Sequence, residues 1–143
     1  MSPGIRVECA DPTIRHHLEL WLQEGALVPP IPLCIDVQLQ ELPKHADAPV
    51  VFQQPGISFR LLPPDDRLLI SWDTAPAVAE FLPGDPCARV TLSPKAIEKL
   101  EQSIRTFFLA VLIFLLRRSG WHHVHGGTAV DLEGRGWLFA GNS

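Results

Sequence analysis

Residues 33–39 read LCIDVQL, and this stretch decides the fold class. Apolar side chains recur at every second position from Leu33 to Leu39, whereas Asp36 and Gln38 lie between them. Successive side chains of a strand point to opposite faces of a sheet, so the pattern predicts a strand that covers a core with one face only.

Further short strands are predicted on both sides of this stretch. Turns rich in Pro, Gly and Asp separate the later strands from one another. Strands at such spacing predict an antiparallel or mixed sheet and not repeated parallel units. The predicted strands cover residues 5–9, 50–53, 57–62, 68–72, 78–82 and 88–92.

Two helices complete the α+β pattern. Asp11 caps the first, which follows the strand at 5–9, and Gly25 ends it. Ser93 caps a long second helix over residues 94–118. Because this helix is apolar on nearly all sides from Phe107 onward, we expect it to be buried between layers.

Composition excludes several classes of protein. The chain has 143 residues, of which 46% are hydrophobic, so it is long and apolar enough to build a core. Its formal net charge is -4, and no basic cluster exceeds Arg117-Arg118, which argues against a nucleic-acid-binding surface. The apolar run at 107–116 is too short to span a bilayer, so no membrane partner is expected.

The cysteines indicate the compartment. Cys9, Cys34 and Cys87 are far apart and form no Cys-x-x-Cys pair. Isolated cysteines of this kind are typical of apolar core positions in a reducing environment, which favours a cytoplasmic location.

The last part of the chain, residues 121–143, reads WHHVHGGTAVDLEGRGWLFAGNS. It predicts a strand at 124–132, a glycine turn at 133–136 and an apolar strand at 137–140, of the kind found at the buried centre of a sheet. His123 and His125 would share one face of the first strand. No carboxylate or thiolate accompanies them at a metal-binding spacing, so ordinary histidines are favoured over a metal site.

The order of these features resembles the HPr kinase/phosphorylase family and related P-loop kinases. In that family a His-Gly strand, a Gly-x-Gly hairpin and an apolar strand precede the phosphate loop G-x-S-G-x-G-K-[ST]. His125-Gly126 matches the first feature and Gly134-Arg135-Gly136 the second. The apolar strand 137–140 matches the third, and Gly141, Asn142 and Ser143 match the first three residues of the loop. The resemblance covers the C-terminal part of the chain and no motif before it.

The resemblance implies ATP-dependent phosphorylation of a hydroxyl, commonly a protein serine, with Mg²⁺. It implies a catalytic-site position for His125 near the phosphate loop, although a structural hydrogen bond between strands is an open alternative for this residue. Gly141, Asn142 and Ser143 would bind the cofactor's phosphates in the complete family member, whereas for the isolated chain a disordered terminus is favoured for Asn142 and Ser143. The Lys that contacts the phosphates and the Ser/Thr that binds Mg²⁺ are not among the 143 residues, so neither ATP nor Mg²⁺ is expected to bind this chain alone.

Two functional interpretations follow. In the first, residues 1–118 form an N-terminal α+β region and residues 119–143 begin a P-loop kinase core. The chain is then the N-terminal portion of an HPr-kinase-like kinase, inactive alone, whose phosphoacceptor is a protein or a small molecule. In the second, the chain is a standalone protein-interaction or regulatory module. In the first interpretation the apolar strand 137–140 lacks the neighbouring strands of the complete core, so it is exposed or is buried by self-association into a homo-oligomer.

Overall fold

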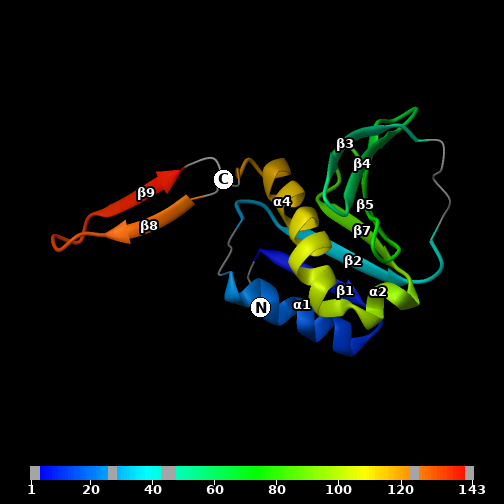
Figure 1. The fold of residues 1–143 in the computed structure, drawn as a ribbon, viewed down its shortest axis with the longest axis horizontal. Helices are drawn as coiled ribbons and strands as arrows, with labels where there is room; N and C mark the ends of the chain where they lie inside the picture. The colour runs from blue at the N-terminus through cyan, green and yellow to red at the C-terminus, as the bar shows by residue number, and fades with distance from the viewer. Residues whose placement is uncertain (1–3, 26–28, 43–47, 123–125, 141–143) are drawn as a thin grey trace.

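The computed structural model describes residues 4–25, 29–42, 48–122 and 126–140 (Figure 1). Within these ranges the protein is mixed α+β, with a seven-stranded sheet, helices packed on it and a separate two-stranded hairpin. None of the helices in this described part combines the length and the apolar character needed to cross a bilayer.

The large sheet has the strand order β1-β2-β7-β6-β5-β4-β3. The pairs β1–β2 and β2–β7 are parallel, and every later neighbour pair is antiparallel, so the expected mixed sheet is confirmed. Each strand begins and ends within a residue of its predicted position. The bounds are β1 Ile5–Cys9, β2 Leu33–Leu39, β3 Val50–Gln54, β4 Ile57–Leu62, β5 Arg67–Trp72, β6 Ala77–Phe81 and β7 Cys87–Leu92.

One face of this sheet carries the core. Ile35 of β2 pairs with Ala88 of β7, and both are fully buried. The buried residues of α1 (Pro12–Glu24), such as Leu18, join the same cluster as Val111 of α4 (Leu109–Arg118). Both helices therefore lie on the same face of the sheet, and the alternation that predicted a one-sided strand in β2 is confirmed.

The opposite face is polar and largely charged. A row of paired residues crosses it from strand to strand, and Leu69 lies buried within this row, outside the main core cluster. In sheet order the row contains Glu8, Asp36, Arg89, Glu80, Leu69 and Arg60.

The cap of the first helix is the one that the sequence predicts. The Asp11 carboxylate accepts hydrogen bonds from the backbone N–H groups of Thr13 and Ile14, at 2.8 and 3.1 Å. These bonds satisfy two of the N–H groups that a helix start leaves without partners. Gly25 ends the helix, as predicted.

The long helix predicted over 94–118 is not continuous. It consists of α2 (Pro94–Glu98), α3 (Leu100–Ser103), the π-helical turn η1 (Ile104–Phe108) and α4. Lys99 has a non-helical backbone (φ −109°, ψ 35°) and separates α2 from α3. Phe107 and Phe108 of the π turn are both fully buried. The predicted cap is confirmed, since Ser93 Oγ accepts the N–H of Ala96 at 3.3 Å.

The expectation that this helix is buried between layers is wrong for the described residues. Val111, Leu112 and Leu115 of α4 are buried against the sheet, but Leu109 is 42% exposed. The described part of the chain has a sheet on only one side of α4. Apolar composition all round a helix indicated a second layer, whereas part of the outer apolar surface of α4 lines a groove described below.

The C-terminal residues form a hairpin of β8 (Gly126–Val130) and β9 (Gly136–Ala140), which pair only with each other among the described strands. The prediction of a buried strand at 137–140 is wrong here, because Trp137, Leu138 and Phe139 are 53%, 64% and 63% exposed. A single hairpin has no second layer to cover it. In the single chain these side chains are exposed, and their burial by self-association stays a prediction.

Candidate functional site

The hairpin brings two parts of the predicted kinase motif together. In its antiparallel register, Gly126 pairs with Ala140 and Val130 pairs with Gly136. Gly126 follows His125 in the sequence, and Ala140 precedes Gly141. The strand ends that adjoin the His-Gly motif and the loop motif are therefore neighbours across the hairpin.

The turn of the hairpin is closed by one carboxylate. Asp131 Oδ1 accepts the backbone N–H groups of Glu133 and Arg135, both at 3.0 Å. Its Oδ2 accepts the Arg135 guanidinium at 2.8 Å and the Trp137 indole N–H at 3.2 Å. Gly134 has a φ of 78°, which glycine adopts without strain. The predicted Gly-x-Gly turn is thus a tight turn, and Asp131 fixes its geometry.

These bonds lower the pKa of the Asp131 carboxyl below its ordinary value. The largest cause is the backbone N–H of Arg135, followed by the indole of Trp137 and the guanidinium of Arg135. All of them donate to the ionised form and favour it.

The four predicted site residues themselves lie outside the described residues. These are His125, for which a catalytic position is implied, and the loop residues Gly141, Asn142 and Ser143. His123, the other histidine considered for metal, also lies outside. Among the residues that are described, no three His, Cys, Asp or Glu side chains lie close enough to hold a metal ion.

Two thiols of the large sheet, those of Cys9 and Cys87, are unsuited to nucleophilic chemistry. Cys34 and Cys87 are partners on the neighbouring strands β2 and β7. Burial, with a smaller contribution from Cys34, raises the pKa of the Cys87 thiol to about 12. Burial also raises the pKa of Cys9. Because the thiolate is the reactive form, Cys9 and Cys87 stay protonated at neutral pH.

A groove that sequence reasoning missed lies between β3, at the edge of the large sheet, and α4. Its volume is about 600 Å³, within the range of roughly 300–1,000 Å³ that is typical of ligand pockets. Phe52 of β3 contacts Phe59 of β4 with ring centres 5.4 Å apart. Phe59 in turn contacts Phe114 of α4 at 5.3 Å. The lining consists of Val51, Phe52, Gln54, Phe59, Leu61, Leu68, Ala110, Ile113, Phe114 and Arg117.

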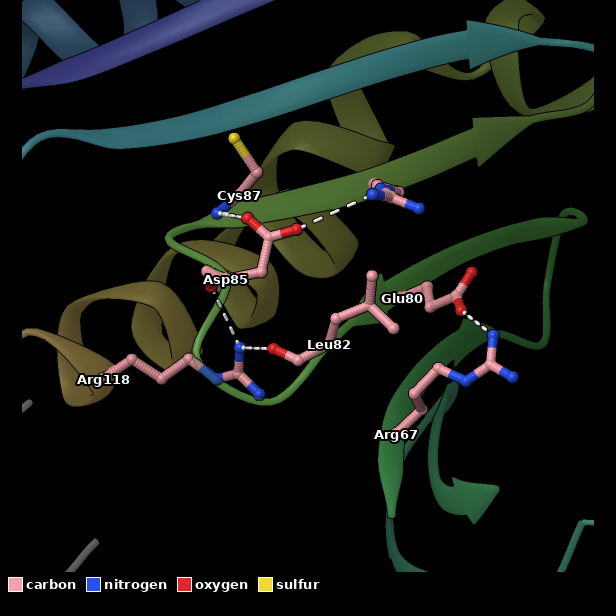
Figure 2. A network of polar contacts seen from close by, with 7 residues as sticks. Arg67, Glu80, Leu82, Asp85, Cys87 and Arg118 are labelled. Carbon is pink, nitrogen blue, oxygen red and sulfur yellow. Dashed lines mark hydrogen bonds and ion pairs between the residues drawn. The ribbon is translucent and has the colours of Figure 1, made fainter. Parts of the chain in front are cut away.

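Two adjacent arginines at the end of α4 have different roles. Arg118 donates to the backbone oxygens of Leu82 and Asp85, at 2.6 and 3.2 Å (Figure 2). Its guanidinium also lies over the Phe81 ring. Arg118 therefore ties α4 to the turn between β6 and β7. Arg117 lies 5.5 Å from the centre of the Phe114 ring and lines the groove. Among the described residues it forms no ion pair.

The turn that receives Arg118 is itself braced by Asp85. Figure 2 shows its carboxylate beside β7, where Oδ1 accepts the backbone N–H of Cys87 at 2.9 Å. Its Oδ2 lies 3.7 Å from the guanidinium of Arg89. On the polar face nearby, Arg67 and Glu80 form an ion pair at 2.6 Å (Figure 2). Arg118 thus joins the end of α4 to a turn that Asp85 braces, while Val111 and Leu115 pack α4 into the core.

No family model, curated protein or solved structure matches this chain. The candidate sites therefore rest on the residues and their geometry: the strand ends of the hairpin, and the groove between β3 and α4.

Proposed function

We propose that this chain is the N-terminal portion of an ATP-dependent kinase that resembles HPr kinase and phosphorylates a hydroxyl group. Residues 1–118 form its N-terminal α+β region, and residues 119–143 begin its P-loop core. The nucleotide would bind with Mg²⁺, and Gly141, Asn142 and Ser143 would start the loop that holds its phosphates.

The register of the hairpin is the observation that supports this proposal best. A phosphate loop needs a strand that leads directly into it, so that successive backbone N–H groups meet the phosphates. β9 ends at Ala140, next to Gly141, and the register sets Gly126 beside that end. A histidine before Gly126 is thereby suited to contact a phosphate or to brace the loop.

The chemistry of the loop defines the first test. The coding sequence after the Ser143 codon is expected to continue as Gly-x-Gly-Lys-[Ser/Thr], because the Lys contacts the β- and γ-phosphates and the hydroxyl binds Mg²⁺. By calorimetry, the 143-residue chain is expected to bind no Mg·ATP, and a chain that contains the complete loop is expected to bind it. Micromolar binding by the 143-residue chain would contradict the proposal.

His125 is tested in the chain that carries the complete loop. Replacing it, His125→Ala, is expected to slow phosphoryl transfer by about 100-fold or more, since a side chain that acts in the transition state typically contributes about 10²- to 10⁴-fold. His16, which is exposed on α1, offers a matched control, and His16→Ala should leave the rate unchanged. An unchanged rate in His125→Ala, with a lower stability to urea, would assign His125 the structural hydrogen bond instead.

A standalone interaction module without catalysis is the second candidate. The apolar groove between β3 and α4 favours it, because its walls come from the region before the kinase motif. A stop codon directly after Ser143, with binding at the groove retained, would select this candidate over the kinase.

A further inference from the structure

We propose that the groove between β3 and α4 binds an extended peptide, which adds to the edge of β3 and directs apolar side chains into the groove and a carboxylate toward Arg117. The inference concerns residues before the kinase motif and holds whether or not the chain binds a nucleotide.

The first support is the edge of the sheet. β3 is the last strand in the sheet order, and among the described strands it pairs only with β4. All five of its residues are exposed, including the apolar Val50, Val51 and Phe52. An edge of this kind presents unpaired N–H and C=O groups, to which an extended segment can add.

The second support is the position of the groove beside this edge. Val51, Phe52 and Gln54 of β3 line it on one side, and Ala110, Ile113 and Phe114 of α4 line it on the other. In Figure 1 the curled end of the sheet that carries β3 lies to one side of α4. An added strand would continue the sheet beyond β3, and every second side chain would enter the groove.

An irregularity in β3 limits the length of this pairing. The register with β4 shifts between Val50 and Phe52, so β3 is regular only over residues 52–54. Two residues of the bulged strand oppose one on its partner, which is how both Val51 and Phe52 reach the groove. A short strand is therefore expected, and the apolar side chains in the groove supply most of the binding energy.

The third support is charge. Arg117 is the single charged residue that lines the groove. Its neighbour Arg118 is held by two backbone oxygens, whereas Arg117 has no carboxylate partner among the described residues. A guanidinium beside an apolar groove favours an occupant that combines apolar side chains with at least one carboxylate.

The test uses the 143-residue chain and a displayed library of dodecapeptides in which apolar and polar positions alternate. Selection is expected to enrich peptides with Asp or Glu over those with Lys or Arg. The most enriched peptide is then synthesised with a fluorescein label, and its affinity is measured by anisotropy. Failure to enrich any alternating peptide would overturn the proposal.

Variants locate the binding. Arg117→Glu is expected to weaken the binding of the labelled peptide by about 10-fold, since it replaces an attraction by a repulsion at a partly exposed site. Arg105→Glu makes the same charge change at an exposed position of η1 outside the groove and should have no effect. Equal losses in the two variants would show a general charge effect and would overturn the role of Arg117.

A steric variant and a modified peptide test the mode of binding. Ala110→Trp fills the groove and should abolish binding in a protein whose circular dichroism is unchanged. If this variant fails to fold, modified peptides still test the mode of binding on the unsubstituted protein. N-methylation at alternate backbone amides removes strand pairing, so it is expected to weaken binding by 10-fold or more. Unchanged affinity after N-methylation would mean that no strand forms and would overturn the proposal.

Discussion

At the scale of single residues, Asp131 accepts more hydrogen bonds than any other carboxylate among the described residues. Four donors from three residues surround it, and they lower the pKa of its side chain. Such local arrangements follow from short spacings in the sequence, as the caps at Asp11 and Ser93 do. The Asp131 network was nevertheless missed, because the sequence does not reveal that the indole of Trp137 turns back toward the turn.

The lowered pKa of Asp131 predicts how the hairpin responds to acid. The ionised carboxylate accepts the bonds, so their stabilisation is fully present above the ordinary Asp pKa of about 3.9. It is lost as the pH falls through the lowered pKa of the folded hairpin. NMR titration of the carboxyl carbon should give a midpoint below the ordinary value, and the amide protons of Glu133 and Arg135 should exchange faster with solvent below it.

Substitution gives a second readout of the same residue. In Asp131→Asn, the amide protons of the hairpin should already exchange fast at neutral pH. Their exchange should no longer show a transition as the pH falls through the range in which Asp131 titrates. Asp65→Asn, on the turn before β5, is the control and should leave hairpin exchange unchanged. A titration of Asp131 at its ordinary pKa would contradict the assigned network.

At the scale of elements, the strands were predicted better than the long helix. The alternation of apolar and polar side chains in β2 shows directly which side chains face the core, and turn residues mark the ends of the other strands. The break at Lys99 and the π turn at Ile104–Phe108 depend instead on packing against the sheet. Apolar side chains around α4 indicated burial, but they cannot distinguish a second layer from a groove, because both are lined by the same apolar residue types.

The different contacts of the two arginines of α4 predict different effects of their removal on stability. Arg118→Ala removes two charged hydrogen bonds to the β6–β7 turn and should lower the free energy of unfolding by about 1 kcal/mol, at the low end for charged bonds because the site is exposed. Arg117→Ala should change it by less than about 0.5 kcal/mol. Urea unfolding followed by circular dichroism measures both, and equal effects would contradict the different roles assigned to the two side chains.

At the scale of the whole molecule, the exposed apolar hairpin predicts self-association. Trp137, Leu138 and Phe139 together present an apolar surface on both sides of β9. Sedimentation velocity of the 143-residue chain should show a mass that rises with concentration. Leu138→Glu should shift the protein toward monomer, whereas Leu20→Glu, at a similarly apolar exposed position of α1, should not. A monomer at all concentrations in the unsubstituted chain would contradict this expectation.

The groove belongs to this scale as well, and it explains why sequence reasoning reached one candidate site and missed the other. The hairpin motif lies within a short segment whose order can be read directly. The groove joins Phe52 to Phe114, which are far apart in the chain, and it exists only because the curled sheet brings its edge toward α4. No periodicity in either segment encodes that approach.

The pairing of Gly126 with Ala140 also constrains how this protein can evolve. A substitution such as Glu133→Ser leaves the number of residues between Val130 and Gly136 unchanged, and with it the register. One inserted residue there would shift the pairing by one position and turn every β9 side chain to the other face. Homologous sequences should therefore vary at turn positions such as Glu133, keep Asp131 and Gly134, and hardly vary in the length of the turn.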